Sequence, residues 1–509
     1  MSTFALTIGT LPVHLGAQAA ATDVERAAAT ITPDDFQWRV EVMAHDSMRG
    51  RDTPSPELEE TALWIASEFR RLGLRGGAED GGFLQHYPLE STSIDVASSR
   101  IEASTGAVMR FGEEIMPIFG APATGSVEAG VVVVSGTRSP TGGSAIEVAG
   151  KHVILVFGDA VERVGRAQFG VIRTVMESGP ASILVVTGMG AAAFRRGAAR
   201  GLRPSVRRPG GEAPEAPPVA LLQLRGDAVA PLLAGAGLRL ATLQGRGDGE
   251  MEVTKVDGLT FDLAVSVAVT PTHAPNVVGI LDGTDPVLKD EYVVFSGHMD
   301  HVGVGTPDAS GDSIYNGADD DASGTAAVME VAQAMASLEV APRRSTIFLV
   351  VSGEEKGLWG SEYFAEHPSV PVDRMVANLN TDMVGRNWPD TIVAIGKEHS
   401  DLGETLDRVN GAHPELRMTA IDDIWPDERF YFRSDHFNFA RKGVPILFFF
   451  NGVHEDYHRP SDEPGAIDAE KAARIARLVF YLGVDIANAT DRPRWNPESF
   501  RRIVSDGSP

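Results

Sequence analysis

The sequence of 509 residues contains no cysteine. Disulfide bonds and thiolate metal sites are therefore both excluded, and any transition-metal site must be built from imidazole and carboxylate groups. Basic residues are also scarce, because 45 lysines and arginines face 70 aspartates and glutamates and leave a formal net charge of −25. Such a surface would repel a polyphosphate, which argues against a nucleic-acid-binding protein and makes cations the more natural charged partners.

Long apolar runs are absent as well, so the sequence predicts no transmembrane helix. Residues 1–21 are apolar and end in small residues, as a signal peptide does before its cleavage site. The positive start of a signal peptide is missing, however, since the first basic residue is Arg26, and Pro12 and His14 interrupt the apolar run. Residues 1–30 are thus either a weak signal, which predicts a secreted or periplasmic protein, or a disordered start that leaves a cytoplasmic location open.

The length favours two domains, or one large domain that carries an insert. Between residues 116 and 251, short β-branched runs alternate with glycine and proline, and candidate ligands are absent, which predicts a separate β-rich module. Within it we expect a helix over Arg166–Ser178, a strand over Ala181–Val186 and a loop over Arg195–Pro218. Residues 492–509 are polar and are expected to form a loosely held tail.

Residues 31–115 and 252–491 are expected to form the other domain. Apolar residues recur on one helical face between Pro56 and Leu72, which predicts an early helix. From Asn276 onward, strand and helix patterns alternate, which is typical of an α/β fold with a mixed, mostly parallel sheet and helices on both faces. The expected buried strands are Tyr292–Phe295, Thr346–Val351, Val376–Leu379 and Val444–Phe450, and the expected helices are Gly324–Leu338, Leu402–Asn410 and Ala469–Ala487.

Polar residues gather where these strands end, and in such folds sites form at the carboxyl ends of the strands. His298 could bind a metal while Asp300 orients it through the second ring nitrogen, although a hydrogen-bonded loop pair is the alternative. Asp319–Asp321 lead into the helix expected from Gly324, either as a solvated helix cap or as part of a metal site. A calcium-binding EF-hand is excluded, because its alternating acidic positions are missing.

Acidic residues and a second histidine follow the remaining strands. Glu354 and Glu355 are adjacent, so their side chains diverge and one can bind a metal while the other faces a metal-bound water; an exposed acidic loop is the alternative. Asp382 and His458 come after the next two strands, with Asp462 as the residue that could orient His458. Two histidines and three carboxylates suit a pair of ions, because a single catalytic zinc usually takes three protein ligands.

In their residues and in their order along the chain, these segments resemble the M28 family of metallopeptidases, which includes bacterial secreted aminopeptidases and, more distantly, glutamate carboxypeptidase. The resemblance implies two zinc ions bridged by Asp320, because the family's ligand lies four residues before the helix-opening Gly324; Asp319 is the nearest rival. It implies Glu354 as the general base. The implied metal ligands are His298, Asp320, Glu355, Asp382 and His458.

Other segments resemble this family too. Arg433–His436 is similar to a segment that lines the substrate site, where Arg433 could stabilise the oxyanion or be an ordinary surface cation. Met48–Arg51 resembles the start of members with this extended layout. The insert at 116–251, including Gly150–Val156, resembles a protease-associated domain, which would carry no catalytic residue and would restrict access to the cleft.

The resemblance therefore implies an exopeptidase that acts on peptides. Two ions about 3.5–4 Å apart would share a hydroxide, and Glu354 would take its proton and pass it to the leaving amine. An aminopeptidase is favoured over a carboxypeptidase or dipeptidase. A carboxypeptidase selective for acidic residues needs several cations at its pocket, and Arg433 is the one cation that can be named near the site. A receptor-like binding protein is a third alternative, but it would be expected to have lost ligands. Phe430, Tyr431, Phe432, Phe437 and Phe439 form either an apolar substrate pocket or core.

Overall fold

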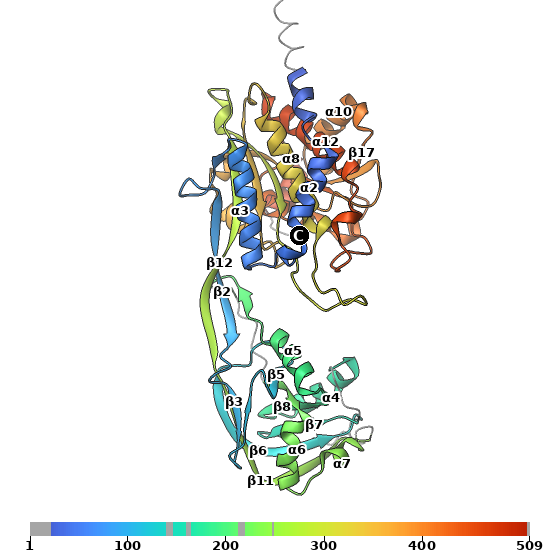
Figure 1. The fold of residues 1–509 in the computed structure, drawn as a ribbon. Helices are drawn as coiled ribbons and strands as arrows, with labels where there is room; N and C mark the ends of the chain where they lie inside the picture. Colours follow the sequence, from blue (N-terminus) through green and yellow to red (C-terminus); the bar gives the residue numbers. More distant parts are fainter. Residues whose placement is uncertain (1–21, 139–145, 159–163, 212–218, 247–248, 506–509) are drawn as a thin grey trace, which may run out of the picture. The chain divides into compact units, whose positions relative to one another are not determined.

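The structure is a computed structural model that describes residues 22–138, 146–158, 164–211, 219–246 and 249–505. The apolar segment 1–21, expected to be a signal or a disordered start, lies outside these residues. The chain divides into two compact units, one made of residues 1–87 and 273–509 and the other of residues 88–272. Both can be followed by colour in Figure 1. Among the described helices, none combines the length and apolar character needed to cross a membrane.

The first unit is built on a mixed sheet whose central strands are parallel, as the sequence predicts. The strand order of this sheet is β17-β16-β18-β15-β13-β14-β12-β2-β9, and the short β1 also pairs with β12. Strands β18, β15, β13 and β14 run parallel, whereas β16 and β12 are antiparallel to their inner neighbours. The bounds are β1 (Arg75–Gly76), β12 (Val267–Leu281), β13 (Tyr292–His298), β14 (Ser345–Val351), β15 (Met375–Thr381), β16 (Thr391–Ile395), β17 (Thr419–Ile421) and β18 (Ile446–Phe450).

Helices cover both faces of this sheet because side chains alternate along each buried strand. Phe295 of β13 lies against Gly483 of α12, and Val294 packs in one apolar cluster with Phe364 of α9 and Phe439 of α11. The helices α2, α3 and α8 pack on the same side as α12, as Figure 1 shows. The bounds are α2 (Pro33–Met43), α3 (Pro56–Arg71), α8 (Gly324–Ala336), α9 (Trp359–Glu366), α10 (Leu402–Ala412), α11 (His436–Ala440) and α12 (Ala469–Asn488).

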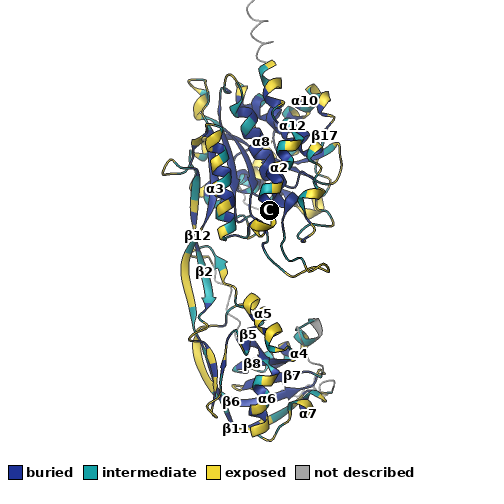
Figure 2. Ribbon diagram, viewed as in Figure 1, coloured by how far each residue is buried: buried dark blue, intermediate teal, exposed yellow. Residues whose placement is uncertain are grey.

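The early helix begins and ends where the sequence predicts. Pro56 opens α3, and the hydroxyl of Ser55 accepts a hydrogen bond from the backbone N–H of Leu58, which caps the helix. Its apolar stripe faces the core and its other side is exposed, as Figure 2 shows.

The second unit has its own sheet, in the order β4-β3-β11-β6-β7-β8-β10-β5. Consecutive valines of β6 face opposite sides: Val131 and Val133 belong to one apolar cluster, Val132 and Val134 to another. The unit extends beyond the expected 116–251 because β3, β4 and β5 pair in this same sheet. Its elements are β2 (Leu84–Ile94), β3 (Arg100–Ala103), β4 (Val108–Arg110), β5 (Ile115–Pro117), β6 (Gly125–Ser135), β7 (His152–Val156), α4 (Arg166–Glu177), β8 (Ser182–Thr187), α5 (Ala191–Gly201), β9 (Ser205–Arg207), β10 (Ala220–Arg225), α6 (Gly226–Gly235), α7 (Leu240–Gln244) and β11 (Glu252–Val265).

Two expected irregular segments prove to be ordered. The loop expected over Arg195–Pro218 begins inside α5, where Phe194 and Ala198 are buried on one helical face; their spacing of one turn and the alanine content outweigh the glycines. The tail expected to be loose carries α13 (Pro497–Phe500), and Ile503 is buried in the core of the first unit. Residues 212–218 and 506–509 lie outside the described residues.

Candidate metal centre

The five residues expected to bind metals lie together at the carboxyl ends of parallel strands. His298 ends β13, Glu355 follows β14 and Asp382 follows β15 directly. Asp320 lies in the turn Ala318–Ser323 before α8, and His458 follows β18. The in-register pairing of β13 with β14 and β15 brings these strand ends to one edge of the sheet.

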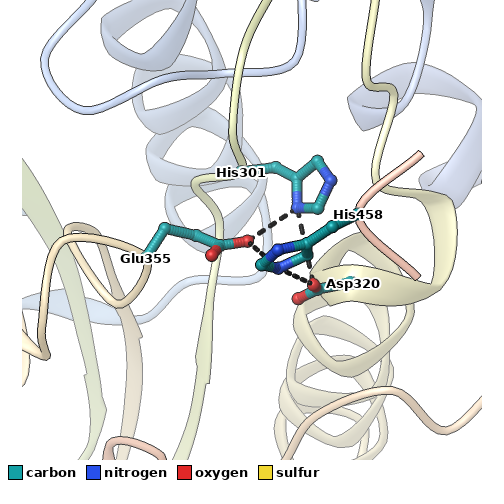
Figure 3. A group of neighbouring side chains, drawn as sticks. All are labelled: His301, Asp320, Glu355 and His458. Carbon is teal, nitrogen blue, oxygen red and sulfur yellow. Dashed lines mark ion pairs between the residues drawn. The ribbon is translucent and has the colours of Figure 1, made fainter. Parts of the chain in front are cut away.

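Two groups of donor atoms form within this rim. The first consists of His301, Asp320, Glu355 and His458, which Figure 3 shows converging on one point. His458 Nε2 lies 3.1 Å from Asp320 Oδ2 and 3.1 Å from Glu355 Oε1. His301 Nδ1 lies 2.9 Å from Glu355 Oε1 and 3.6 Å from Asp320 Oδ2.

The second group consists of His298, Asp320 and Asp382. His298 Nε2 lies 3.5 Å from Asp320 Oδ1 and 3.8 Å from Asp382 Oδ2. Asp320 therefore directs one oxygen to each group, which is the arrangement of a bridging carboxylate.

These spacings lie on either side of those expected around divalent zinc. Donors that surround a tetrahedral zinc ion at about 2.0–2.2 Å lie roughly 3.3–3.6 Å from one another, and the donor distances in the two groups run from 2.9 to 3.8 Å. In the first group, His301 Nδ1, Glu355 Oε1 and His458 Nε2 are buried, and none makes a contact of hydrogen-bond geometry within the described residues. Buried polar atoms are normally paired, and a cation bound between these donors would pair with all of them.

The local charges point in the same direction. Burial raises the pKa of Asp320, and the nearby Glu355 carboxylate raises it further. Burial lowers the pKa of His458, but the carboxylates of Asp320 and Glu355 outweigh it and raise that pKa to about 10. Burial would raise the pKa of Glu355, but the imidazoles of His301 and His458 outweigh burial and lower it. Protons and a divalent cation would therefore compete for the donors of the first group.

A hydrogen bond to the backbone orients the ring of His298 for metal binding. Its Nδ1 donates to the backbone oxygen of Asp300 at 3.1 Å, which leaves Nε2 free to face Asp320 and Asp382. The carboxylate of Asp300 was the expected partner, but it lies farther away, at 3.6 Å, and accepts instead from Thr53 Oγ1 and from the backbone N–H of Glu354.

Asp462 was expected to orient His458, but its carboxylate holds the turn that carries Asp320. Its carboxylate accepts from the backbone N–H groups of Asp319 and Asp320 at 3.1–3.2 Å, so it fixes the turn that carries the bridging residue. No hydrogen bond joins it to His458 within the described ranges. The reason is that at Asp462, four residues after His458, the chain has turned back toward the aspartate turn, where the backbone N–H of Ala318 donates to the backbone oxygen of Asp462.

The remaining expected site residues surround a pocket next to the second group. Glu354 and Arg433 line it together with His298, Asp320 and Asp382. Arg433 is half exposed, and its guanidinium lies over the ring of Phe430 and near Glu428. The apolar part of the lining is Met383, Phe430, Phe448, Phe450, Val453 and Tyr457.

Of the aromatic residues considered for this pocket, Phe430 lines it. Tyr431 and Phe439 are buried in the core, and Phe432 and Phe437 pack against that core. Ser434, within the Arg433–His436 segment, donates to Asp382 Oδ2 at 2.9 Å and so helps to fix that carboxylate.

Two residues of the site were not predicted from the sequence. His301 joins the first group, and its only signal was its place three residues after His298. Arg51, in the early segment that resembles family members, is fully buried and donates to the backbone oxygens of Met43, Met299, Asn316 and Gly317. It thereby ties the loop after β13 to the turn that carries Asp320.

The chain is similar to known peptidases. Residues 276–483 match the model of peptidase family M28. The chain is 28% identical over 302 residues to a probable zinc metalloprotease of Pyricularia oryzae, covering 51% of this chain and 57% of that protein. It is 26% identical over 250 residues to aminopeptidase YwaD of Bacillus subtilis, covering 47% of this chain and 50% of the relative. The chain thus spans little more than half the length of these curated relatives.

Among solved structures, the fold is similar to that of BSAP, a zinc aminopeptidase from Bacillus subtilis, with a TM-score of 0.51 and 16% identity. That likeness covers 91% of this chain and 97% of the other.

Proposed function

Because residues 276–483 match the model of peptidase family M28, we propose that the chain is a dinuclear zinc exopeptidase that removes residues from the N-termini of peptides. The family resemblance seen in the sequence is confirmed by the match over residues 276–483. The observation that carries the finer proposal is the pair of donor groups that share Asp320 beside a pocket lined by a half-buried carboxylate, Glu354.

The donor set suits two ions with unlike surroundings. His301, Asp320, Glu355 and His458 would hold one ion, and His298, Asp320 and Asp382 the other. When bound, such a pair supplies Lewis acidity that polarises the scissile carbonyl and lowers the pKa of water.

Glu354 is the group best placed to move protons. Burial raises its pKa well above the usual range, although the positive charge of His298 opposes the shift, and the side chain lines the pocket. A carboxylate with an elevated pKa can take a proton from the attacking water and return it to the leaving amine. Asp300 helps to fix its position by accepting from the Glu354 backbone N–H.

The pocket favours apolar side chains next to a positively charged N-terminus. Three phenylalanines, Met383 and Val453 line it, and so do the carboxylic residues Glu354 and Asp382. Apart from His298, the one basic side chain in this lining is Arg433, and its exposed guanidinium is shared with Glu428. A free amino group fits these carboxylates better than a free carboxylate would, so the aminopeptidase is favoured over the carboxypeptidase or dipeptidase.

A substrate panel tests this proposal. We expect hydrolysis of leucyl- and phenylalanyl-p-nitroanilide, slower hydrolysis of glutamyl-p-nitroanilide, and none of the N-acetylated leucyl compound. Cleavage confined to N-blocked peptides with free C-termini would instead support the carboxypeptidase. A protein that binds zinc but cleaves none of these compounds would support the receptor-like alternative.

The second unit is proposed to be the protease-associated type of insert that its sequence resembles. Neither donor group contains a residue of this unit, and neither does the pocket lining. Its contribution would therefore be to the choice of peptide and not to the chemical step.

A further inference from the structure

We propose that His301 is an additional metal ligand, so that the two metal positions differ in kind: one has four protein donors and the other has three. This inference rests on the proposed dinuclear function, because it concerns how the same pair of ions is held. The four-donor position is formed by His301, Asp320, Glu355 and His458, and the three-donor position by His298, Asp320 and Asp382.

The placement of His301 matches that of a ligand. Its Nδ1 is 2.9 Å from Glu355 Oε1 and 3.6 Å from Asp320 Oδ2, the same two atoms that His458 Nε2 approaches at 3.1 Å. The two imidazole rings are steeply inclined, at 76°, with centroids 5.4 Å apart. They therefore reach the carboxylates from different directions, as two corners of a tetrahedron do, and Figure 3 shows this approach.

The ring has no other partner that would explain its burial. His301 is completely buried, and within the described part of the chain neither ring nitrogen has a hydrogen-bond partner. Leaving a buried polar group unpaired is costly, so an unpaired buried imidazole is suited to binding a cation. A cation between the two carboxylates would pair with Nδ1 and would explain why its close approach to Glu355 lacks hydrogen-bond geometry.

The surrounding backbone is shaped to hold this ring. The backbone N–H of His301 donates to the oxygen of Arg51 at 3.3 Å, and Arg51 is itself anchored to the turn before Asp320. Gly317 has φ +57°, and a Cβ there would lie 2.5 Å from the ring Cγ of His301. The chain thus makes room for an imidazole beside the bridging aspartate.

A difference in donor number has a chemical consequence. Zinc held by four protein ligands in a tetrahedron is typical of closed sites, whereas three ligands leave a position for water or substrate. We therefore expect the four-donor position to bind zinc more tightly and to fill first. The three-donor position, next to the pocket, would fill last and would control when the enzyme becomes active.

A rival role for His301 is that of a hydrogen-bond donor that positions Glu355. Two variants separate the roles. His301→Asn keeps an N–H donor close to the place of Nδ1 but offers only a weak amide ligand, whereas His301→Ala removes both. His454→Ala is the matched control, because His454 is a buried imidazole of the same rim that contacts Asp319 and belongs to neither donor group.

The experiment is a zinc titration of the metal-depleted full-length protein against a chromophoric chelator. The wild type and His454→Ala should show two binding steps. Both His301 variants should weaken the tighter step by at least about 100-fold, since even loss of a residue that only supports a ligand costs 10–100-fold. X-ray absorption of the two-zinc wild type should report three imidazoles shared by two ions, falling to two in either variant.

Full recovery of the tighter step in His301→Asn, or an imidazole count of two in the wild type, would overturn the proposal in favour of the positioning role. These outcomes differ from failure of the proposed function. A protein that binds no pair of zinc ions would contradict the dinuclear site itself, whereas unchanged binding in His301→Ala would contradict only the ligand assignment.

Discussion

Asp319–Asp321 are identical residues with three different tasks. Asp321 accepts from the backbone N–H groups of His298, Gly324 and Met383, and Asp319 Oδ1 accepts from that of Gly385. Asp320 alone belongs to both donor groups. The family resemblance implied Asp320, because the family's ligand lies four residues before the helix-opening glycine. It could not show that Asp319 and Asp321 accept hydrogen bonds from the backbone.

This division of tasks gives a paired prediction. Asp320→Asn removes the charge shared by both donor groups, so both zinc affinities should fall by at least about 100-fold. Asp319→Asn keeps an acceptor oxygen for Gly385, so zinc binding should change far less. Equilibrium dialysis with zinc measured by mass spectrometry checks both variants. Equal loss in the two would mean that the aspartate run is a structural turn with no single bridging residue.

Glu354 differs from its neighbour Glu355 in belonging to neither donor group. Glu354→Gln should keep both zinc ions and lower kcat by about 10²–10⁴-fold, the usual contribution of a general acid–base group. KM should change little, because the pocket wall is untouched. Steady-state kinetics on leucyl-p-nitroanilide with parallel metal analysis tests this, and near-normal turnover would contradict the role of Glu354.

Among the elements, α2 is joined to α8 by a buried ion pair. Arg39 Nε donates to Glu330 Oε1 at 2.6 Å, and the same guanidinium reaches Gln333 and Glu68. Burial raises the pKa of Glu330 from 4.5 to about 7 even though Arg39 opposes the shift. The protonation of Glu330 therefore bears on the packing of α2 against α8 in the unit that holds the site.

The raised pKa predicts the sign of a pH effect. The folded state binds this proton more tightly than the unfolded state, so the contribution of Glu330 to stability is fully present below about pH 4.5 and is lost as pH rises through about 7. Relative to Glu330→Gln, which has no proton to lose, the wild type should become less stable between pH 5 and 8. Thermal unfolding of both proteins across that range is the measurement. A relative gain in wild-type stability would show that Arg39 lowers this pKa.

At the scale of the whole molecule, the second unit is inserted through two paired strands. The backbone N–H of Val278 donates to Phe83, and that of Asp95 to Ser266, so β2 and β12 run antiparallel and the insert leaves and returns side by side. Replacing residues 95–266 by an Asn-Gly hairpin turn would join these strands directly.

We expect this deletion to keep both zinc ions and the hydrolysis of a small p-nitroanilide, because both donor groups and the pocket lining lie in the first unit. The choice among longer peptides should change. Zinc analysis and circular dichroism of the shortened protein check the outcome. A folded protein that lost its zinc would show that the insert supports the metal centre.

Much of the first unit was accessible from sequence because its strands are continuous apolar runs that end in polar residues. His298, Glu355 and Asp382 each follow such a run, and parallel pairing brings them together. Long-range contacts without a local signal were not accessible. No local pattern marks Arg51 as buried, yet its guanidinium donates to four backbone oxygens. In the same way, Ile503 is buried in the core of the first unit, and Trp495 and Val504 pack against that core, although the tail is polar overall.

The most direct test of the dinuclear exopeptidase is the rate of leucyl-p-nitroanilide hydrolysis as zinc is returned to the metal-depleted protein. The account predicts little activity while the first ion fills the four-donor position, and a rise that reaches its limit at two zinc ions per chain. Full activity in the metal-free protein, or a rate that saturates at one ion per chain, would contradict it.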